Sequence, residues 1–250
     1  MAWTTEAELV RSFVALVDAM LKNPWTVYAE TAGWDLLLQH RDGFQLGIEA
    51  KLSLNAKVVE QALSGTTSFY DSTGPDYRAV LVPESKLQKH LVTICRALGI
   101  GIIALREKHN SLRLPDQTWC WNDWPNWCPL ERCKLPDYVP DVCGGHSAPL
   151  KLTEWKIKAI RLCILLERRG FVTRADFKDL QISPTRWTDA YYGFLVRAPE
   201  RGGFIAGPCT PDFRTEHPTN FAEVEADFDR WGAKLLNARF DPKLPLAGAA

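Results

Sequence analysis

An aspartate and a Glu-x-Lys triplet lie near the start of the chain, at Asp35 and at Glu49-Ala50-Lys51. Two carboxylates that meet in space form a site for a hard cation such as Mg²⁺, which proteins hold through one or two carboxylates. A lysine beside that cation could orient or activate a water molecule for attack on a phosphodiester. The other interpretation is a solvent-facing hairpin with a surface Lys–Glu pair, because Glu-x-Lys triplets are common.

The hairpin register decides whether the two carboxylates meet. Arg41-Asp42-Gly43 separates two strand-like runs, Trp34–His40 and Phe44–Leu54. A three-residue loop with its glycine in the left-handed region pairs Asp35 with Glu49 and places both on one face, together with the lysine. A two-residue loop would move them to opposite faces and split the apolar residues between the faces. The hydrophobic pattern therefore favours the three-residue loop, with one core face made of Leu36, Leu38, His40, Phe44, Leu46, Ile48 and Ala50.

The surrounding sequence alternates between helical and strand-like patterns. An apolar stripe predicts a helix over Glu6–Lys22, and an asparagine cap predicts another over Asn55–Leu63. Further elements are expected at Val27–Thr31 (strand), Arg78–Val82 (strand), Ser85–Leu98 (helix) and Ile100–Leu105 (strand). The order helix, three strands, helix, strand, helix, strand predicts an α/β domain with a mixed sheet.

This arrangement resembles the PD-(D/E)xK (restriction-endonuclease-like) nuclease superfamily over about residues 5–105. The resemblance implies an αβββαβ core in which Asp35 and Glu49 bind Mg²⁺ or Mn²⁺ and Lys51 positions the attacking water. Related resolvases add a glutamate from the first helix, for which Glu8 is the best-placed candidate and Glu6 the second. A glutamine on the helix after the lysine is also common, and Gln61 is similar.

A stretch rich in tryptophan, cysteine and proline follows, from about residue 116 to 149. Cys128, Cys133, Cys143 and His146 could form a Zn²⁺ site, although only the last pair has a typical spacing. Buried free thiols are the favoured alternative. The tryptophans could stack on nucleic-acid bases, but packing of an irregular connection is the stronger interpretation.

The C-terminal part predicts three helices and a hairpin, an order that resembles a winged helix-turn-helix. The helices are expected over Leu152–Arg169, from a Thr173 cap through Leu180, and from Ser183-Pro184 through Leu195; the hairpin turns at Arg201-Gly202. Residues 151–214 hold twelve basic and seven acidic side chains, an excess suited to phosphate. Arg186, Thr188 and Arg201 are the candidate DNA contacts. Dimerisation or domain packing is the other use of such a module.

Composition sets the broad limits. The 250 residues carry 30 basic and 30 acidic side chains, which excludes a uniformly basic nucleic-acid coat. No apolar run approaches the roughly 20 residues that span a bilayer, and the N-terminus lacks a secretion signal. Seven cysteines, an odd number, favour a reducing cytoplasmic location. We expect a nuclease-like domain over 1–115, a connection over 116–149, a winged-helix-like domain over 150–240 and a frayed tail over 241–250.

The leading hypothesis is thus a Mg²⁺-dependent DNA endonuclease, with DNA as partner and no membrane association. A catalytically inactive nuclease-fold regulator or adaptor that binds DNA is the alternative, and a zinc-structured protein-interaction module is a third. A homodimer that cuts both strands is compatible with the sequence, which carries no signal of an interface.

Overall fold

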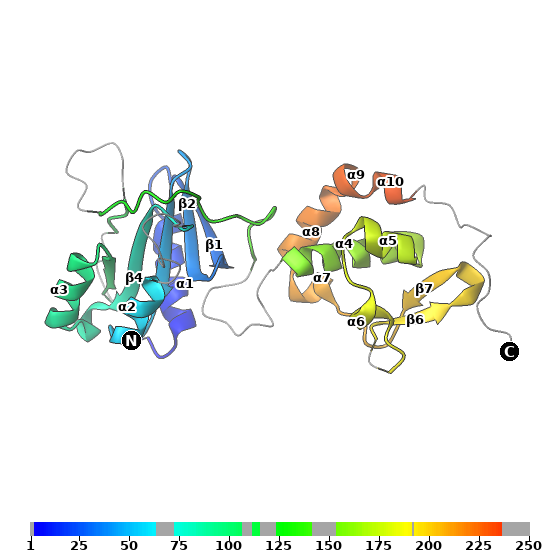
Figure 1. Cartoon of the computed structure of the whole chain (residues 1–250), viewed down its shortest axis with the longest axis horizontal. Coiled ribbons are helices and arrows are strands. Elements are labelled where there is room, and N and C mark those ends of the chain that lie inside the picture. Colours follow the sequence, from blue (N-terminus) through cyan, green and yellow to red (C-terminus); the bar gives the residue numbers. More distant parts are fainter. Residues whose placement is uncertain are drawn as a thin grey trace. The chain divides into compact units, whose positions relative to one another are not determined.

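The computed structural model describes residues 3–63, 73–106, 112–115, 124–141, 154–191 and 193–236. The chain divides into two compact units, Met1–Lys151 and Leu152–Ala250 (Figure 1). Among the described residues, no helix is long and apolar enough to cross a bilayer.

Five strands form a single mixed sheet in the first unit, with the spatial order β1-β2-β3-β4-β5. The strands are β1 (Trp25–Thr31), β2 (Trp34–His40), β3 (Gln45–Ala50), β4 (Tyr77–Pro83) and β5 (Gly101–Leu105). The first three strands pair antiparallel, whereas β4 and β5 continue the sheet parallel to β3. The predicted α/β class with a mixed sheet is therefore confirmed.

Three α-helices accompany the sheet within the described residues of this unit: α1 (Glu6–Asp18), α2 (Ala56–Ala62) and α3 (Lys89–Ala97). The side chains of Thr5 and Asn55 accept hydrogen bonds from backbone N–H groups in the first turns of α1 and α2, as N-cap residues do. The expected helix over Ser85–Leu98 is interrupted. A 3₁₀ turn, η1, covers Glu84–Lys86. The next residue, Leu87, has an extended backbone (ψ 137°) that separates this turn from α3.

Both faces of the sheet are buried. On one face, α1 packs through Leu9, Val10, Phe13 and Val17 against the apolar residues of the hairpin. The opposite face, on which the sequence had indicated mainly the acidic residues, carries a second core of residues from β2, α2, β4 and α3. This second core forms because parallel β3, β4 and β5 need cover on both faces.

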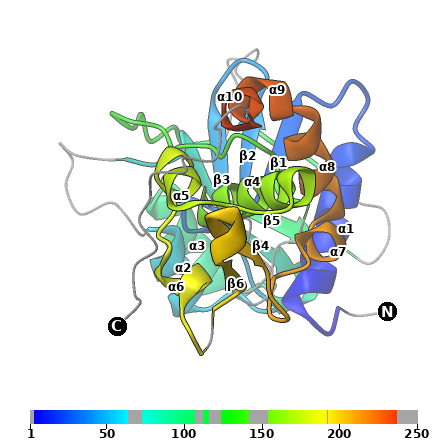
Figure 2. The same ribbon diagram turned by 90° about the vertical axis from the view of Figure 1, so that its right-hand side faces the viewer.

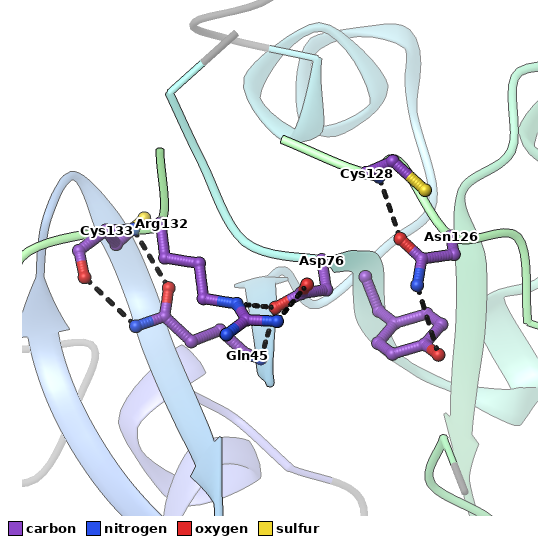
Figure 3. Close-up of polar contacts among 7 residues, drawn as sticks. Gln45, Asp76, Asn126, Cys128, Arg132 and Cys133 are labelled. Atoms are coloured by element: carbon purple, nitrogen blue, oxygen red, sulfur yellow. Dashed lines mark hydrogen bonds and ion pairs between the residues drawn. The ribbon is translucent and has the colours of Figure 1, made fainter. Parts of the chain in front are cut away.

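An irregular segment, residues 124–135, is fixed along the first unit; we call it the strap. Asp76 accepts two hydrogen bonds from the guanidinium of Arg132, at 2.8 and 2.9 Å, and one from the backbone N–H of Gln45, at 2.7 Å (Figure 3). The Gln45 side chain exchanges two hydrogen bonds with the backbone of Cys133, at 2.9 and 3.0 Å. These contacts join the strap to the starts of β3 and β4.

The second unit begins with a long buried helix and a small antiparallel hairpin. Its elements are α4 (Glu154–Arg169), α5 (Arg174–Asp179), α6 (Thr185–Thr188), β6 (Leu195–Ala198), η3 (Pro199–Arg201) and β7 (Gly203–Ala206). Val172, between the first two helices, forms a β-bridge with Phe204. Thr173 and Asp176 form the predicted capping box, and the Asp176 carboxylate also pairs with Arg169.

The third predicted helix is much shorter than expected. It ends at Thr188, because Asp189 has an extended backbone (ψ 137°) and the chain then turns toward β6. The indole of Trp187 is fully buried and meets Phe194 edge-on at 5.2 Å between ring centroids. Trp187 and Phe194, which the sequence placed within one helix, thus pack against each other from the two sides of a turn.

Four helices follow in the described part of this unit: α7 (Phe213–Glu216), α8 (Pro218–Ala226), α9 (Phe228–Trp231) and α10 (Ala233–Leu236). Figure 2 looks onto this unit, where α8 lies against α4. In that contact the buried Lys156 Nζ lies 3.1 Å from His217 Nε2.

Candidate active site

The β2–β3 hairpin has the register that the sequence predicts. Leu36 pairs with Ile48 and Leu38 with Leu46. The loop is closed by a hydrogen bond from the His40 N–H to the carbonyl of Phe44, 2.9 Å, and its glycine has a φ of +90°. Continuing this register by one residue places Asp35 opposite Glu49, at the end of the hairpin away from the loop.

Asp35 links the two strands and the lysine. Its Oδ2 accepts a hydrogen bond of 2.8 Å from the backbone N–H of Ala50. The same oxygen lies 3.5 Å from the Nζ of Lys51, and about one fifth of each of these two side chains is exposed. The aspartate, the lysine and the neighbouring Glu49 therefore form one compact group, here called the acidic group, at the C-terminal end of β3.

The first helix contributes Glu6 to the acidic group. Its Oε2 lies 3.0 Å from the Nζ of Lys51, at the first residue of α1. Burial opposes the charge on Lys51, but the negative charges of Asp35 and Glu6 outweigh it and raise the pKa of the lysine. Lys51 is therefore an ammonium group at neutral pH, able to donate hydrogen bonds but not to accept a proton.

Glu49 is the most perturbed member of the group. Only 4% of the residue is exposed. Burial, together with the neighbouring negative charge of Asp35, raises the pKa of Glu49 from 4.5 to about 8, although the charge of Lys51 acts in the opposite direction. A buried carboxyl beside a second carboxylate keeps its proton at neutral pH unless a cation compensates the charge.

Glu30 was not among the residues singled out from the sequence. Its charge also raises the pKa of Glu49. The flanking pairs Ala29–Leu36 and Thr31–Trp34 place it opposite Asp35, so three carboxylates lie along one row across β1, β2 and β3. Glu30 has a φ of +50°. The sequence does contain a signal for this placement. The two-residue turn after Thr31 fixes how β1 pairs with β2, and therefore which residue lies opposite Asp35.

Two of the expected residues do not join the acidic group through any hydrogen bond among the described residues. The carboxylate of Glu8 instead accepts from Thr4 and Thr5 and closes the capping box of α1. The ranking of Glu8 above Glu6 was therefore wrong in geometric terms. Gln61 lies on α2, and its buried Oε1 accepts no hydrogen bond from the described part of the chain.

The cysteines of the proposed zinc site are only partly visible. Cys143 and His146 lie outside the described residues. Cys128 is exposed, whereas Cys133 is half-buried and burial raises the pKa of its thiol. Two of the tryptophans, Trp119 and Trp121, also lie outside the described residues.

The other two tryptophans of that stretch pack against the first unit. The Nε1 of Trp127 donates a 2.9 Å hydrogen bond to the carbonyl of Gly99. The same indole lies 4.6 Å from the guanidinium carbon of Arg78. Trp124 packs against the core of the α1 face. These contacts agree with the interpretation that the tryptophans hold an irregular connection in place.

The expected DNA contacts of the second unit differ in their surroundings. Arg186 is exposed, and its guanidinium carbon lies 5.2 Å from the Phe194 ring. The hydroxyl of Thr188 donates to the carbonyl of Pro184 within α6. Arg201 is exposed in η3, next to the tip of the hairpin.

Several other basic residues of this unit are already engaged. Arg214 pairs with Glu167 and Glu225 across the packed helices, and Lys156 is buried. Seven exposed cations of this unit form no ion pair with a described residue. Five of them lie on α5, α6 and the hairpin (Arg174, Lys178, Arg186, Arg197 and Arg201), and the other two are Arg168 and Lys234.

No set of three or more His, Cys, Asp or Glu side chains with metal-binding geometry occurs among the described residues. Two carboxylates nevertheless suffice for an ion that keeps several water ligands, as Mg²⁺ does. Asp35 and the neighbouring Glu49, whose pKa is raised to about 8 by burial and by the charge of Asp35, are chemically suited to such an ion.

No family model, no curated protein and no solved structure matches this chain. A function must therefore be inferred from the geometry and chemistry of its own residues.

Proposed function

We propose that the protein is a metal-dependent DNA endonuclease that hydrolyses phosphodiester bonds at the acidic group. The observation that carries the proposal is the juxtaposition of Asp35, Glu49 and Lys51 at the end of β3. The resemblance to the PD-(D/E)xK superfamily supports it further, because the elements of the first unit follow the αβββαβ order.

Asp35 and Glu49 would hold the Mg²⁺ or Mn²⁺ ion, and Glu30 would add negative potential from the neighbouring strand. When bound, the ion would neutralise charge that develops on the phosphoryl oxygens. Glu49 would have to release its proton when the ion binds, because its pKa in the metal-free protein is about 8. Metal affinity, and with it activity, should therefore rise between pH 6 and pH 8.

Lys51 would act as a hydrogen-bond donor that positions the attacking water and the phosphate. Its raised pKa argues against a role as general base. Glu6 would act as a positioning residue, since its carboxylate holds the ammonium group at 3.0 Å. In the reaction, a bond forms between the water oxygen and phosphorus while the bond from phosphorus to the leaving oxygen breaks. The water proton passes to solvent, and the leaving oxygen takes up a proton from solvent.

The second unit would hold the DNA. Its helix–bridge–helix–helix–hairpin order resembles that of a winged helix-turn-helix, although α6 is a single turn. The exposed cations of α5, α6 and the hairpin, Arg186 and Arg201 among them, suit phosphate contacts. Thr188 is less suited to a base contact because its hydroxyl already donates within α6.

Cleavage of supercoiled plasmid in Mg²⁺ or Mn²⁺ tests the proposal. Asp35→Asn, Glu49→Gln and Lys51→Met should each lower the rate at least about 100-fold, the usual scale for loss of an electrostatic or proton-handling group. Glu60→Gln is the matched control, because Glu60 is an exposed carboxylate on α2. Equal nicking by the Glu49→Gln variant and the wild-type protein would overturn the proposal. Salt-dependent DNA binding without any cleavage would favour the non-cutting regulator or adaptor.

A further inference from the structure

A hollow of about 480 Å³ lies beside the start of β5. Ligand sites commonly have volumes of 300–1,000 Å³, so this hollow is large enough for a small molecule or one unit of a polymer. Gly101 and Ile102 form its floor, and β5 is the edge strand of the sheet among the described strands. Nothing in the proposed hydrolysis makes use of this hollow.

Among the described residues that line the hollow, two are arginines and none is a carboxylate. Arg96, in the last turn of α3, and Arg113 are both exposed, and neither forms an ion pair with a described residue. The residues that flank Arg113, Leu112 and Leu114, pack on the core of the α1 face and hold this short segment against the unit. Two guanidinium groups beside one hollow attract an anion, and their planar fork suits phosphate best.

The wall of the hollow is aromatic. A methyl group at Gly101 would overlap the indole ring of Trp124, so the ring rests directly on the backbone of the edge strand. A tryptophan fixed in this way offers a flat surface on which a nucleobase can stack whatever its identity. The charged and aromatic residues together match a nucleotide better than they match an acidic peptide or a simple inorganic anion.

The register of the sheet relates the hollow to the acidic group. Glu49 pairs with Val80, and Val80 pairs with Ile102, so the floor of the hollow and the buried glutamate lie on one row. Two strand spacings separate them, about 10 Å between backbones. The hollow and the acidic group are therefore separate places on one sheet, with the buried Val80 between them.

We propose that this hollow is a subsite that binds one nucleotide of a single-stranded segment, with its base on Trp124 and its phosphate between Arg96 and Arg113. As part of a cleavage site, the subsite rests on the proposed endonuclease function. Its binding of a single strand requires no metal ion and is tested separately.

The test measures binding of two fluorescent oligonucleotides of roughly ten units to the full chain in EDTA. One carries thymine bases and the other is abasic throughout. The wild-type protein should bind the base-bearing strand more tightly. Arg96→Gln and Arg113→Gln should each weaken both complexes. Each should also make the slope of log K against log salt concentration shallower by about 0.7, the value for one phosphate contact to a single strand. Arg11→Gln, which removes an exposed arginine from α1, should change neither affinity.

Trp124→Leu should weaken binding of the base-bearing strand by roughly tenfold and leave that of the abasic strand unchanged. Equal wild-type affinity for the two strands would overturn the proposal without requiring any variant to fold. Arginine variants that bind as the wild-type protein does would also overturn it. Plasmid cleavage that persists in those cases would leave the endonuclease proposal standing, whereas selective strand binding without cleavage would leave only the subsite.

Discussion

Replacing Glu49 with glutamine should remove a pH-dependent loss of stability from the metal-free protein. The pKa of Glu49 rises from 4.5 to about 8 on folding, because burial and Asp35 both disfavour its charge. The native state therefore holds a proton that the unfolded chain releases. The stability that this group provides is complete below pH 4.5, declines as the pH rises, and is lost once the pH passes 8.

The size of the effect follows from these two pKa values. Between pH 5 and pH 7 the unfolded carboxyl ionises while the native one stays protonated, which costs on the order of 2 kcal/mol at 1.36 kcal/mol per pH unit. For a protein of this size that corresponds to roughly 4–8 °C in Tm. Glutamine has no proton to release, so Glu49→Gln should lack this decline.

Urea or thermal unfolding in EDTA at pH 5, 6 and 7 measures the decline directly. The difference in unfolding free energy between Glu49→Gln and wild type should grow with pH, whereas Glu60→Gln should follow the wild-type curve. Parallel curves for Glu49→Gln and wild type would refute the argument, since they would mean that Glu49 ionises normally in the native state.

Three further outcomes test the packing around the acidic group and in the second unit. Gly47→Ala should lower the free energy of unfolding in urea by about 1–3 kcal/mol, because the added methyl group would overlap the indole ring of Trp34. A variant as stable as the wild-type protein would contradict this contact. Asp76→Ala should cost about 1–3 kcal/mol and speed proteolysis of the strap, because the Asp76 carboxylate accepts two hydrogen bonds from Arg132 of the strap and one from Gln45 of β3. Unchanged cleavage sites and rates would show that the strap is held otherwise. The thiol of Cys163 is buried, and burial is the main cause that raises its pKa to about 12. At pH 8 it should therefore react with a thiol label at least about ten times more slowly than the exposed Cys209, which peptide mass spectrometry would measure. Equal rates would contradict the burial of Cys163.

Local signals in the sequence predicted most of the first unit. The loop glycine specified the hairpin register, and that register determined which carboxylates meet. The choice between Glu6 and Glu8 was also decidable locally, because Thr5-x-x-Glu8 is a capping-box pattern that commits the second carboxylate to the start of the helix.

Features that depend on distant parts of the chain could not be predicted in this way. The strap meets β3 and β4 through residues 56 and 88 positions apart, as in the Asp76–Arg132 and Gln45–Cys133 contacts. The helix expected through Leu195 failed for a related reason. Its aromatic spacing suits a helix, but the buried indole of Trp187 is packed by rings from α4, α5 and the chain beyond the turn.

Direct titration of metal ion into the protein tests the central claim, that Asp35 and Glu49, with Lys51 beside them, form one metal-binding site. Calorimetry with Mg²⁺ or Mn²⁺ at pH 7, repeated in two buffers of different ionisation enthalpy, measures both the affinity and the protons released. We predict one site whose binding releases close to one proton, and which is lost in Asp35→Asn but kept in Glu60→Gln. Binding that releases no proton, or that survives in Asp35→Asn, would contradict the claim.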